Sequence, residues 1–198
     1  MDPRHLRADR EAVFPNLRKE DYRVTSEEDT DYNCLAHAAD KNDTWWWPMP
    51  EEVEGVFWPR DVPREETLAC FILAYRTEGY LPCDSSELEE GVDKIALYVD
   101  ADGTPSHAAK QLTGGGWSSK LGIWEAIEHR TLANLEAGPG SAGYGKVGQI
   151  LKRNRLSPIV PTTDAAAPQA GDEPEEDPVI PSTPAAQPPT PPSSVPDP

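Results

Sequence analysis

Apolar residues recur at helical spacing in the segment between Pro63 and Gly79. The positions on one stripe are Leu68, Phe71, Ile72 and Tyr75. Proline and glutamate at the start of such a segment, and glycine just after it, are typical of helix boundaries. The pattern therefore predicts an amphipathic helix over residues 64–78, with its apolar stripe facing a core.

Two further patterns precede this helix. Residues 34–39 are good helix formers, and Asp31 or Asn33 can accept hydrogen bonds from the first free N–H groups, so we expect a short helix that starts at about Cys34. The aromatic segments 45–48 and 56–59 each end in proline, which disfavours helix in the residue before it. These two segments are predicted to be extended and to cover a core.

The second half of the body predicts a small antiparallel sheet. Residues 94–99 and 105–112 are expected to be strands joined by a turn at 100–104, where Gly103 supplies a positive φ. A third strand is expected at 117–120 and two helices at 123–135 and 146–155. Helices, then a sheet, then helices indicate the α+β class.

Composition divides the chain into three parts. Residues 1–24 form an N-terminal arm, residues 25–156 a globular domain, and residues 157–198 an acidic, proline-rich tail without Lys, Arg or aromatic residues. We expect this tail to be disordered. Its prolines at 188–192 have polyproline II character, so a domain that recognises such helices is one candidate partner.

The charge and cysteine content limit the class of protein. A formal net charge of −17 disfavours partners with a phosphate backbone, so no nucleic-acid partner is expected. The sequence lacks an apolar stretch long enough to span a membrane and lacks a signal peptide, and its three cysteines are too few and odd in number for a disulfide framework. A reduced, cytoplasmic protein without membrane partners is the expectation.

Candidate chemistry centres on Cys34 and His107. A thiol at a helix N-terminus has a lowered pKa, a histidine within hydrogen-bond reach activates it, and a third polar group fixes the histidine tautomer. Strand alternation places Gln111 on the same face of the sheet as His107. Cys34 and His107 are therefore a candidate nucleophile and base.

Five segments give the chain a family resemblance over about residues 31–150. They are 33–38 (NCLAHA), 45–48 (WWWP), 94–98 (KIALY), 107–112 (HAAKQL) and 117–122 (WSSKLG). Together they resemble an uncharacterised family of small bacterial domains, associated with the papain-like cysteine peptidase and amidase superfamily. The resemblance implies a Cys-bearing helix packed on an antiparallel sheet that carries the histidine, and hydrolysis or transfer at an amide or isopeptide bond.

Carried onto this sequence, the resemblance makes Cys34 the nucleophile and His107 the base. The third residue is Ser119 or Gln111, since the strand at 117–120 has no Asn or Asp. No Gln precedes Cys34 to bind an oxyanion, which leaves the Cys34 N–H and the Asn33 amide as candidate donors. The residues expected to line the cleft are Trp46, Trp47, Trp117 and Lys120.

Other hypotheses about the function remain open at this point. One is a non-catalytic binding or immunity-type domain of the same fold, and another is a toxin-like effector that attacks a host or competitor protein. A metal site is a further alternative, because Cys34 and His37 share a helix face and Cys83 with His107 would complete a tetrahedral set. We expect no cofactor, no metal, and a protein or peptide-like substrate. Glu125 and His129 are expected to form an exposed pair at i, i+4 of a helix.

Overall fold

A computed structural model describes residues 4–137 and 142–155, so the predictions for the tail lie outside the described residues. The helices are α1 (Ala8–Glu11), α2 (Cys34–Ala38) and α3 (Leu68–Thr77), with 3₁₀ turns η1 (Lys19–Asp21) and η2 (Leu132–Leu135). The strands are β1 (Tyr22–Val24), β2 (Trp45–Trp46), β3 (Val56–Phe57), β4 (Leu81–Cys83), β5 (Val92–Val99), β6 (Pro105–Gln111), β7 (Trp117–Lys120), β8 (Ala126–His129) and β9 (Lys146–Asn154).

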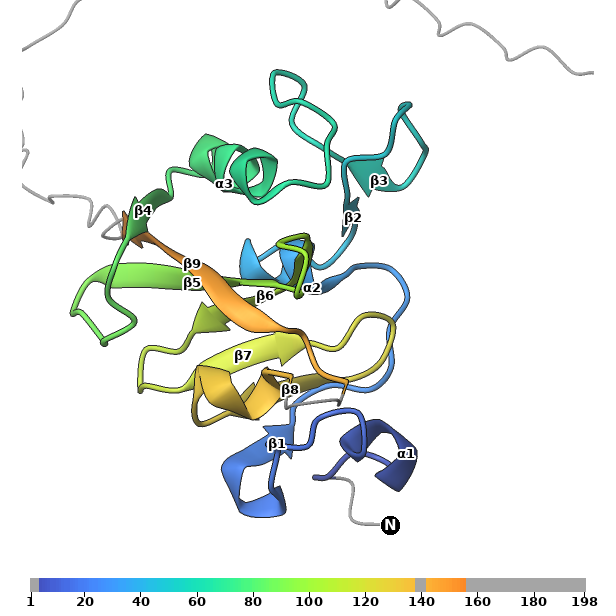
Figure 1. Ribbon diagram of the computed structural model, residues 1–198, viewed down its shortest axis with the longest axis vertical. Coiled ribbons are helices and arrows are strands. Elements are labelled where there is room, and N and C mark those ends of the chain that lie inside the picture. The colour runs from blue at the N-terminus through green and yellow to red at the C-terminus, as the bar shows by residue number, and fades with distance from the viewer. Residues whose placement is uncertain (1–3, 138–141, 156–198) are drawn as a thin grey trace, which may run out of the picture. The chain divides into compact units, whose positions relative to one another are not determined.

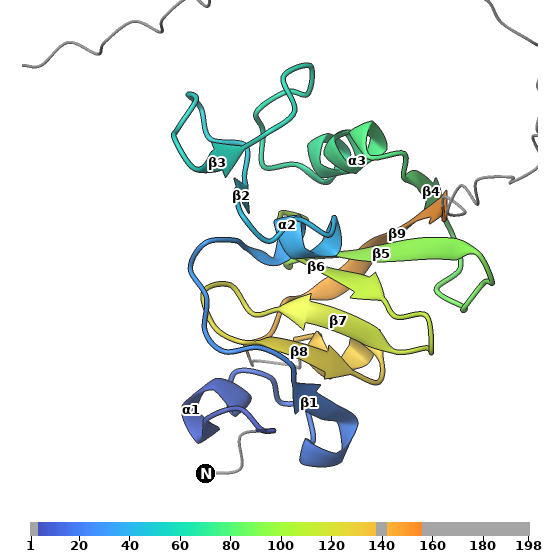
Figure 2. The same ribbon diagram turned by 180° about the vertical axis from the view of Figure 1, so that it is seen from behind.

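The described residues contain one large antiparallel sheet of seven strands and a two-stranded parallel pair. The strand order of the large sheet is β1-β8-β7-β6-β5-β9-β4, and β2 pairs with β3. The short helix α2 packs on β6 and β7, while α3 contacts β4 (Figures 1 and 2). The helix–strand mixture agrees with the expected α+β class at this level.

Several predicted elements are confirmed. The short helix begins at Cys34, both aromatic segments are extended, and 92–99 and 105–111 form a hairpin with Gly103 at φ 84°. Helix α3 exists but begins at Leu68, four residues after the expected start, because the Thr67 side chain accepts from the Cys70 N–H and so caps the helix there.

Both helices predicted after the sheet are wrong. Residues 126–129 form strand β8, which pairs with β1 and β7, and η2 is only a short 3₁₀ turn. Residues 146–154 form β9, which pairs with β5 on one side and β4 on the other. Hydrogen bonds to two partner strands decide the conformation of β9, whereas its local sequence does not.

Two apolar cores lie on the two faces of the large sheet, which we call the helix-side core and the arm-side core. Alternation along β5 assigns Leu97 to the helix-side core and Tyr98 to the arm-side core. The helix-side core contains Cys34, Leu35, Trp46, Phe71, Tyr75, Leu97 and Ala108. The arm-side core contains Leu6, Phe14, Leu17, Tyr22, Tyr98, Ala109, Trp117 and Ile127. Apolar residues before Val24 therefore pack against the sheet.

Candidate functional site

The N-terminus of α2 is fixed to β2 by the side chain of Asn33. Its Oδ1 accepts from the N–H groups of Ala36 and Trp46, and its Nδ2 donates to the Trp46 carbonyl at 2.8 Å. Both ends of this buried amide are therefore occupied. The prediction that Asn33 serves as an oxyanion donor is not supported by this arrangement, and the Cys34 N–H remains the candidate donor from that prediction.

Cys34 is the first residue of α2 and is buried. Burial is the largest influence on its thiol and raises the pKa to about 11, while the N–H groups of Ala108, Leu35 and Cys34 itself, and the positive charge of Lys120, act in the opposite direction. The expectation of a lowered pKa is thus wrong. The sulfur nevertheless lies among donors and a cation that favour a thiolate.

The Cys34 thiol lies beside β6, on the side of the sheet that α2 covers. These two strands pair only at Lys110–Ser118 and Gln111–Trp117, so the first part of β6 has no partner on that side. The Ala108 N–H lies near the thiol and favours its charged form. Cys34 belongs to the helix-side core, whereas the His107 ring packs against Tyr98 and Tyr144 of the arm-side core, and no hydrogen bond joins the two side chains in the described structure.

His107 is buried, and its ring lies on the arm-side face. The ring stacks on Tyr144 with centroids 3.9 Å apart and meets Tyr98 edge to face at 5.4 Å. Burial lowers its pKa well below the ordinary value, with His129 and His37 adding to the effect, so the imidazole is neutral. Its Nε2 is 3.0 Å from Ser119 Oγ, whereas Nδ1 has no hydrogen-bond partner in the part of the chain that is described.

Of the two candidates for the third residue, the structure brings Ser119 to His107. Ser119 Oγ also lies 2.9 Å from Nε2 of His129, whose Nδ1 is 2.9 Å from the carbonyl oxygen of Thr131. Gln111 instead donates to the Ser86 carbonyl. His129 was not predicted as a site residue because residues 123–135 were expected to be helical, and the sequence Ala-Ile-Glu-His at 126–129 has no strand alternation that would have revealed it.

Lys120 is fully buried beside the segment that leads into α2. Its Nζ donates to the carbonyls of Asp29, Gly122 and Trp124 at 2.6–2.7 Å and lies 5.1 Å from the ring centroid of Tyr32. Burial lowers its pKa. A buried ammonium group therefore ties residues 29–32 to the β7–β8 turn, a role different from that of the predicted cleft residue.

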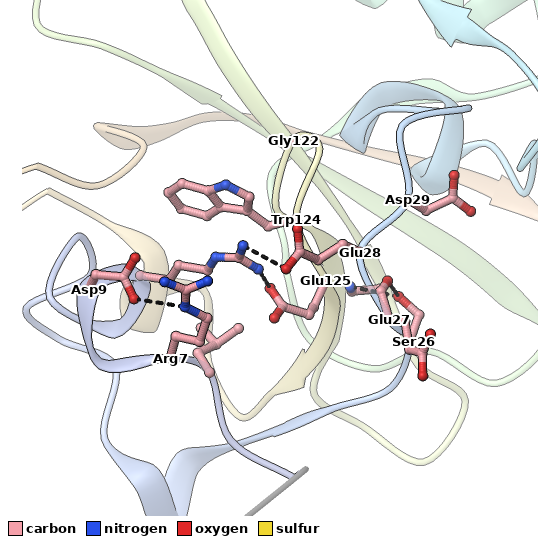
Figure 3. A network of polar contacts seen from close by, with 12 residues as sticks. Arg7, Asp9, Ser26, Glu27, Glu28, Asp29, Gly122, Trp124 and Glu125 are labelled. Atoms are coloured by element: carbon pink, nitrogen blue, oxygen red, sulfur yellow. Dashed lines mark hydrogen bonds and ion pairs between the residues drawn. The ribbon is translucent and has the colours of Figure 1, made fainter. Parts of the chain in front are cut away.

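A second cation holds the same two segments together. Glu28 and Glu125 both point toward one guanidinium group, which belongs to Arg10 and is stacked near Trp124 (Figure 3). Glu125 is thus paired with the N-terminal part of the chain, and the predicted pair with His129 is not formed. Arg10 and Lys120 together fix the segment before Cys34.

The tryptophans predicted to line a cleft are mostly core residues. Trp46 is 1% exposed and packs in the helix-side core, and Trp117 is buried in the arm-side core. Trp47 is half-buried, and its indole N–H donates to Glu66. These residues pack in or against the cores of the domain, so the packing favours the prediction that the aromatic segments cover a core.

Within residues 4–137 and 142–155, no three His, Cys, Asp or Glu side chains gather as metal ligands, so the tetrahedral set of Cys34, His37, Cys83 and His107 is not assembled. His37 instead bonds Ser118 Oγ at 2.9 Å. In the same residues, every helix is too short or too polar to cross a bilayer.

Comparison with known proteins identifies the family of the chain. A family model with the description "Domain of unknown function (DUF7689)" matches residues 23–152, which covers all strands of the large sheet except parts of β1 and β9. No curated protein and no solved structure matches the chain.

Proposed function

The chain belongs to the DUF7689 family of domains of unknown function, and we propose that it is a thiol-dependent hydrolase or transferase that acts on an amide or isopeptide bond. The observation that carries the proposal is the position of Cys34 at the start of α2, near Ala108, the residue that follows His107 on β6. A Cys-bearing helix on an antiparallel sheet that carries the histidine is also the arrangement implied by the papain-like resemblance.

The proposed reaction uses a neutral thiol and a neutral imidazole. Cys34 and His107 are not hydrogen-bonded in the arrangement described, so the two side chains must first come within reach of each other; Nδ1 of His107 then takes the proton of Cys34 as the sulfur attacks the substrate carbonyl carbon. The Cys34 N–H, with the other N–H groups around the sulfur, stabilises the developing oxyanion. His107 then gives the proton to the departing amine, and water or an acceptor amine cleaves the thioester and returns the free thiol.

The electrostatics around the thiol are consistent with this chemistry. Three N–H groups and the Lys120 cation favour the thiolate, and only burial opposes it. Since desolvation dominates, the pKa of the thiol falls when solvent or substrate reaches the sulfur.

The same burial favours a second function, a non-catalytic binding domain of the same fold. In that case Cys34 is a small core residue, and no base acts on it. The two functions make different predictions for the reactivity of the thiol.

The test is alkylation of folded protein with iodoacetamide, followed by mass spectrometry of each cysteine. At pH 7.5 we expect Cys34 to react in wild type and His107→Ala to slow it by about 10²-fold, the lower end of the contribution of a general base. Near pH 11 the two rates converge, because the thiolate then forms without a base.

Cys70 and Cys83 in the same molecule are internal references, and His37→Gln is a control for the loss of another buried histidine. If Cys34 reacts only when the protein unfolds, with or without His107, the hydrolase proposal is wrong and the binding domain is favoured. Equal rates for His107→Ala and His37→Gln at pH 7.5 also contradict it.

A further inference from the structure

A buried series of hydrogen bonds ends at His107, and the groups in it determine which atom donates and which accepts at each step. It runs from the Thr131 carbonyl to His129, then to Ser119 Oγ and then to Nε2 of His107, with successive distances of 2.9, 2.9 and 3.0 Å. A carbonyl oxygen only accepts, so Nδ1 of His129 must carry a proton. Burial lowers the pKa of His129 to about 4, so this ring is neutral and its Nε2 is an acceptor.

The remaining protons follow from this assignment. The hydroxyl of Ser119 has a single proton and must donate it to Nε2 of His129, so toward His107 its oxygen accepts. Nε2 of His107 therefore carries the proton of that neutral ring. Nδ1 of His107 is left as a bare acceptor, and it is the ring nitrogen without a partner among the described residues.

We infer that His129 is a positioning residue, which acts through Ser119 to hold the proton of His107 on Nε2 and to leave Nδ1 free to accept a proton. The inference rests on the proposed function for its purpose, since a bare Nδ1 is what the base needs to take the Cys34 proton. The tautomer itself is a property of the fold and can be measured separately.

Burial makes this control effective. Ser119 and His129 are 0% and 3% exposed, so water does not compete for their hydrogen bonds. Without His129, the Ser119 hydroxyl is free to turn and donate to Nε2 of His107, which moves the ring proton to Nδ1 in part of the population. A glutamine at position 129 has both an acceptor for Ser119 and a donor for the Thr131 carbonyl, and so preserves the direction of the chain.

The experiment measures the tautomer by long-range ¹H–¹⁵N NMR of the imidazoles, in which a bare nitrogen resonates far downfield of an N–H. We expect a single Nε2–H tautomer of His107 in wild type and His129→Gln, and a mixture in His129→Leu. His37→Gln removes a different buried histidine–serine pair and is expected to leave the His107 tautomer unchanged. Thermal melts and His129→Gln separate the tautomer effect from loss of folding.

The second readout is the alkylation rate of Cys34. The rate is expected to fall in His129→Leu in proportion to the lost fraction of the competent tautomer, about 2- to 10-fold, and to recover in His129→Gln. A proton on Nδ1 of His107 in wild type, or one unchanged tautomer in His129→Leu, overturns the inference. If the tautomer responds as expected but Cys34 never reacts, the proposed function fails and the positioning role of His129 stands.

Discussion

Replacing Trp46 with alanine tests how much this buried tryptophan contributes to the stability of the domain. Trp46 is 1% exposed, and its ring centroid lies 5.1 Å from that of Phe57 and 5.8 Å from that of Tyr75. Its backbone is held by the Asn33 side chain, which the substitution leaves in place. The loss should therefore come from the cavity alone.

The size of this loss follows from the buried area. A buried tryptophan removes about 150–250 Å² from water, worth about 4–6 kcal/mol at about 25 cal/mol per Å², and measured losses for such truncations are about 3–5 kcal/mol. We expect Trp46→Ala to cost about 4 kcal/mol, a large part of the stability of a domain of this size. Trp45 and Trp47 are half-buried, so their alanine variants should each cost less than about 2 kcal/mol.

Urea unfolding followed by far-UV circular dichroism measures all three variants, and this signal does not depend on the tryptophans that are removed. If Trp46→Ala leaves no folded state, Trp46→Phe provides a smaller cavity that still permits the comparison. A cost for Trp45→Ala equal to that for Trp46→Ala would contradict the reasoning. A loss below about 1 kcal/mol for Trp46→Ala would also contradict it, because cavities of this size cost more.

Three further predictions concern titration and buried charge. Because burial raises the pKa of Cys34 to about 11, its alkylation rate in folded His107→Ala protein, where no base takes the thiol proton, should rise about tenfold per pH unit between pH 7 and 10, and a plateau below pH 9 in that variant would contradict this. The folded-state pKa values of His37 and His129 are lowered to about 4, below the unfolded value of about 6.5, so the unfolded state takes up protons first on acidification. The free energy of unfolding, measured by urea titration, should therefore fall between pH 6.5 and 4 by up to about 3 kcal/mol per histidine. His129→Gln should reduce that fall. Lys120→Met leaves three carbonyls without their donor and should lower the free energy of unfolding by about 3 kcal/mol. Lys110→Met, which loses a partly exposed ion pair with Asp40, should lower it by less than about 1 kcal/mol. Equal losses would show that the carbonyl bonds of Lys120 contribute little.

The parts of the fold that sequence reasoning predicted well depend on local signals. Asn33 caps the helix at Cys34, and Gly103 closes the β5–β6 hairpin, and both effects operate within a few residues. Strand β9 could not be predicted this way, because its partners β5 and β4 lie far away in the sequence. Gly148 in the middle of β9 disfavours a helix, which is the local signal that was available.

The residues of the candidate site likewise divide into those with a local sequence signal and those without one. Cys34, His107 and Ser119 were predicted from a helix start and from neighbouring strands, and the structure joins His107 to Ser119. His129 reaches Ser119 only because residues 126–129 pair with β7, a contact that no short-range pattern specifies. The pKa of Cys34 was predicted in the wrong direction because the degree of burial depends on packing across the whole domain.

The placement of β9 between β5 and β4 has a consequence for how the chain folds during synthesis. Strand β4 pairs with β9 and with no other described strand, so residues 81–83 have no partner until residues 146–154 have been made. Until then the long strand β5 also exposes an open edge that carries the apolar residues of both cores. Such an edge is a template for pairing with other chains, so nascent or truncated forms that lack β9 should be the aggregation-prone species.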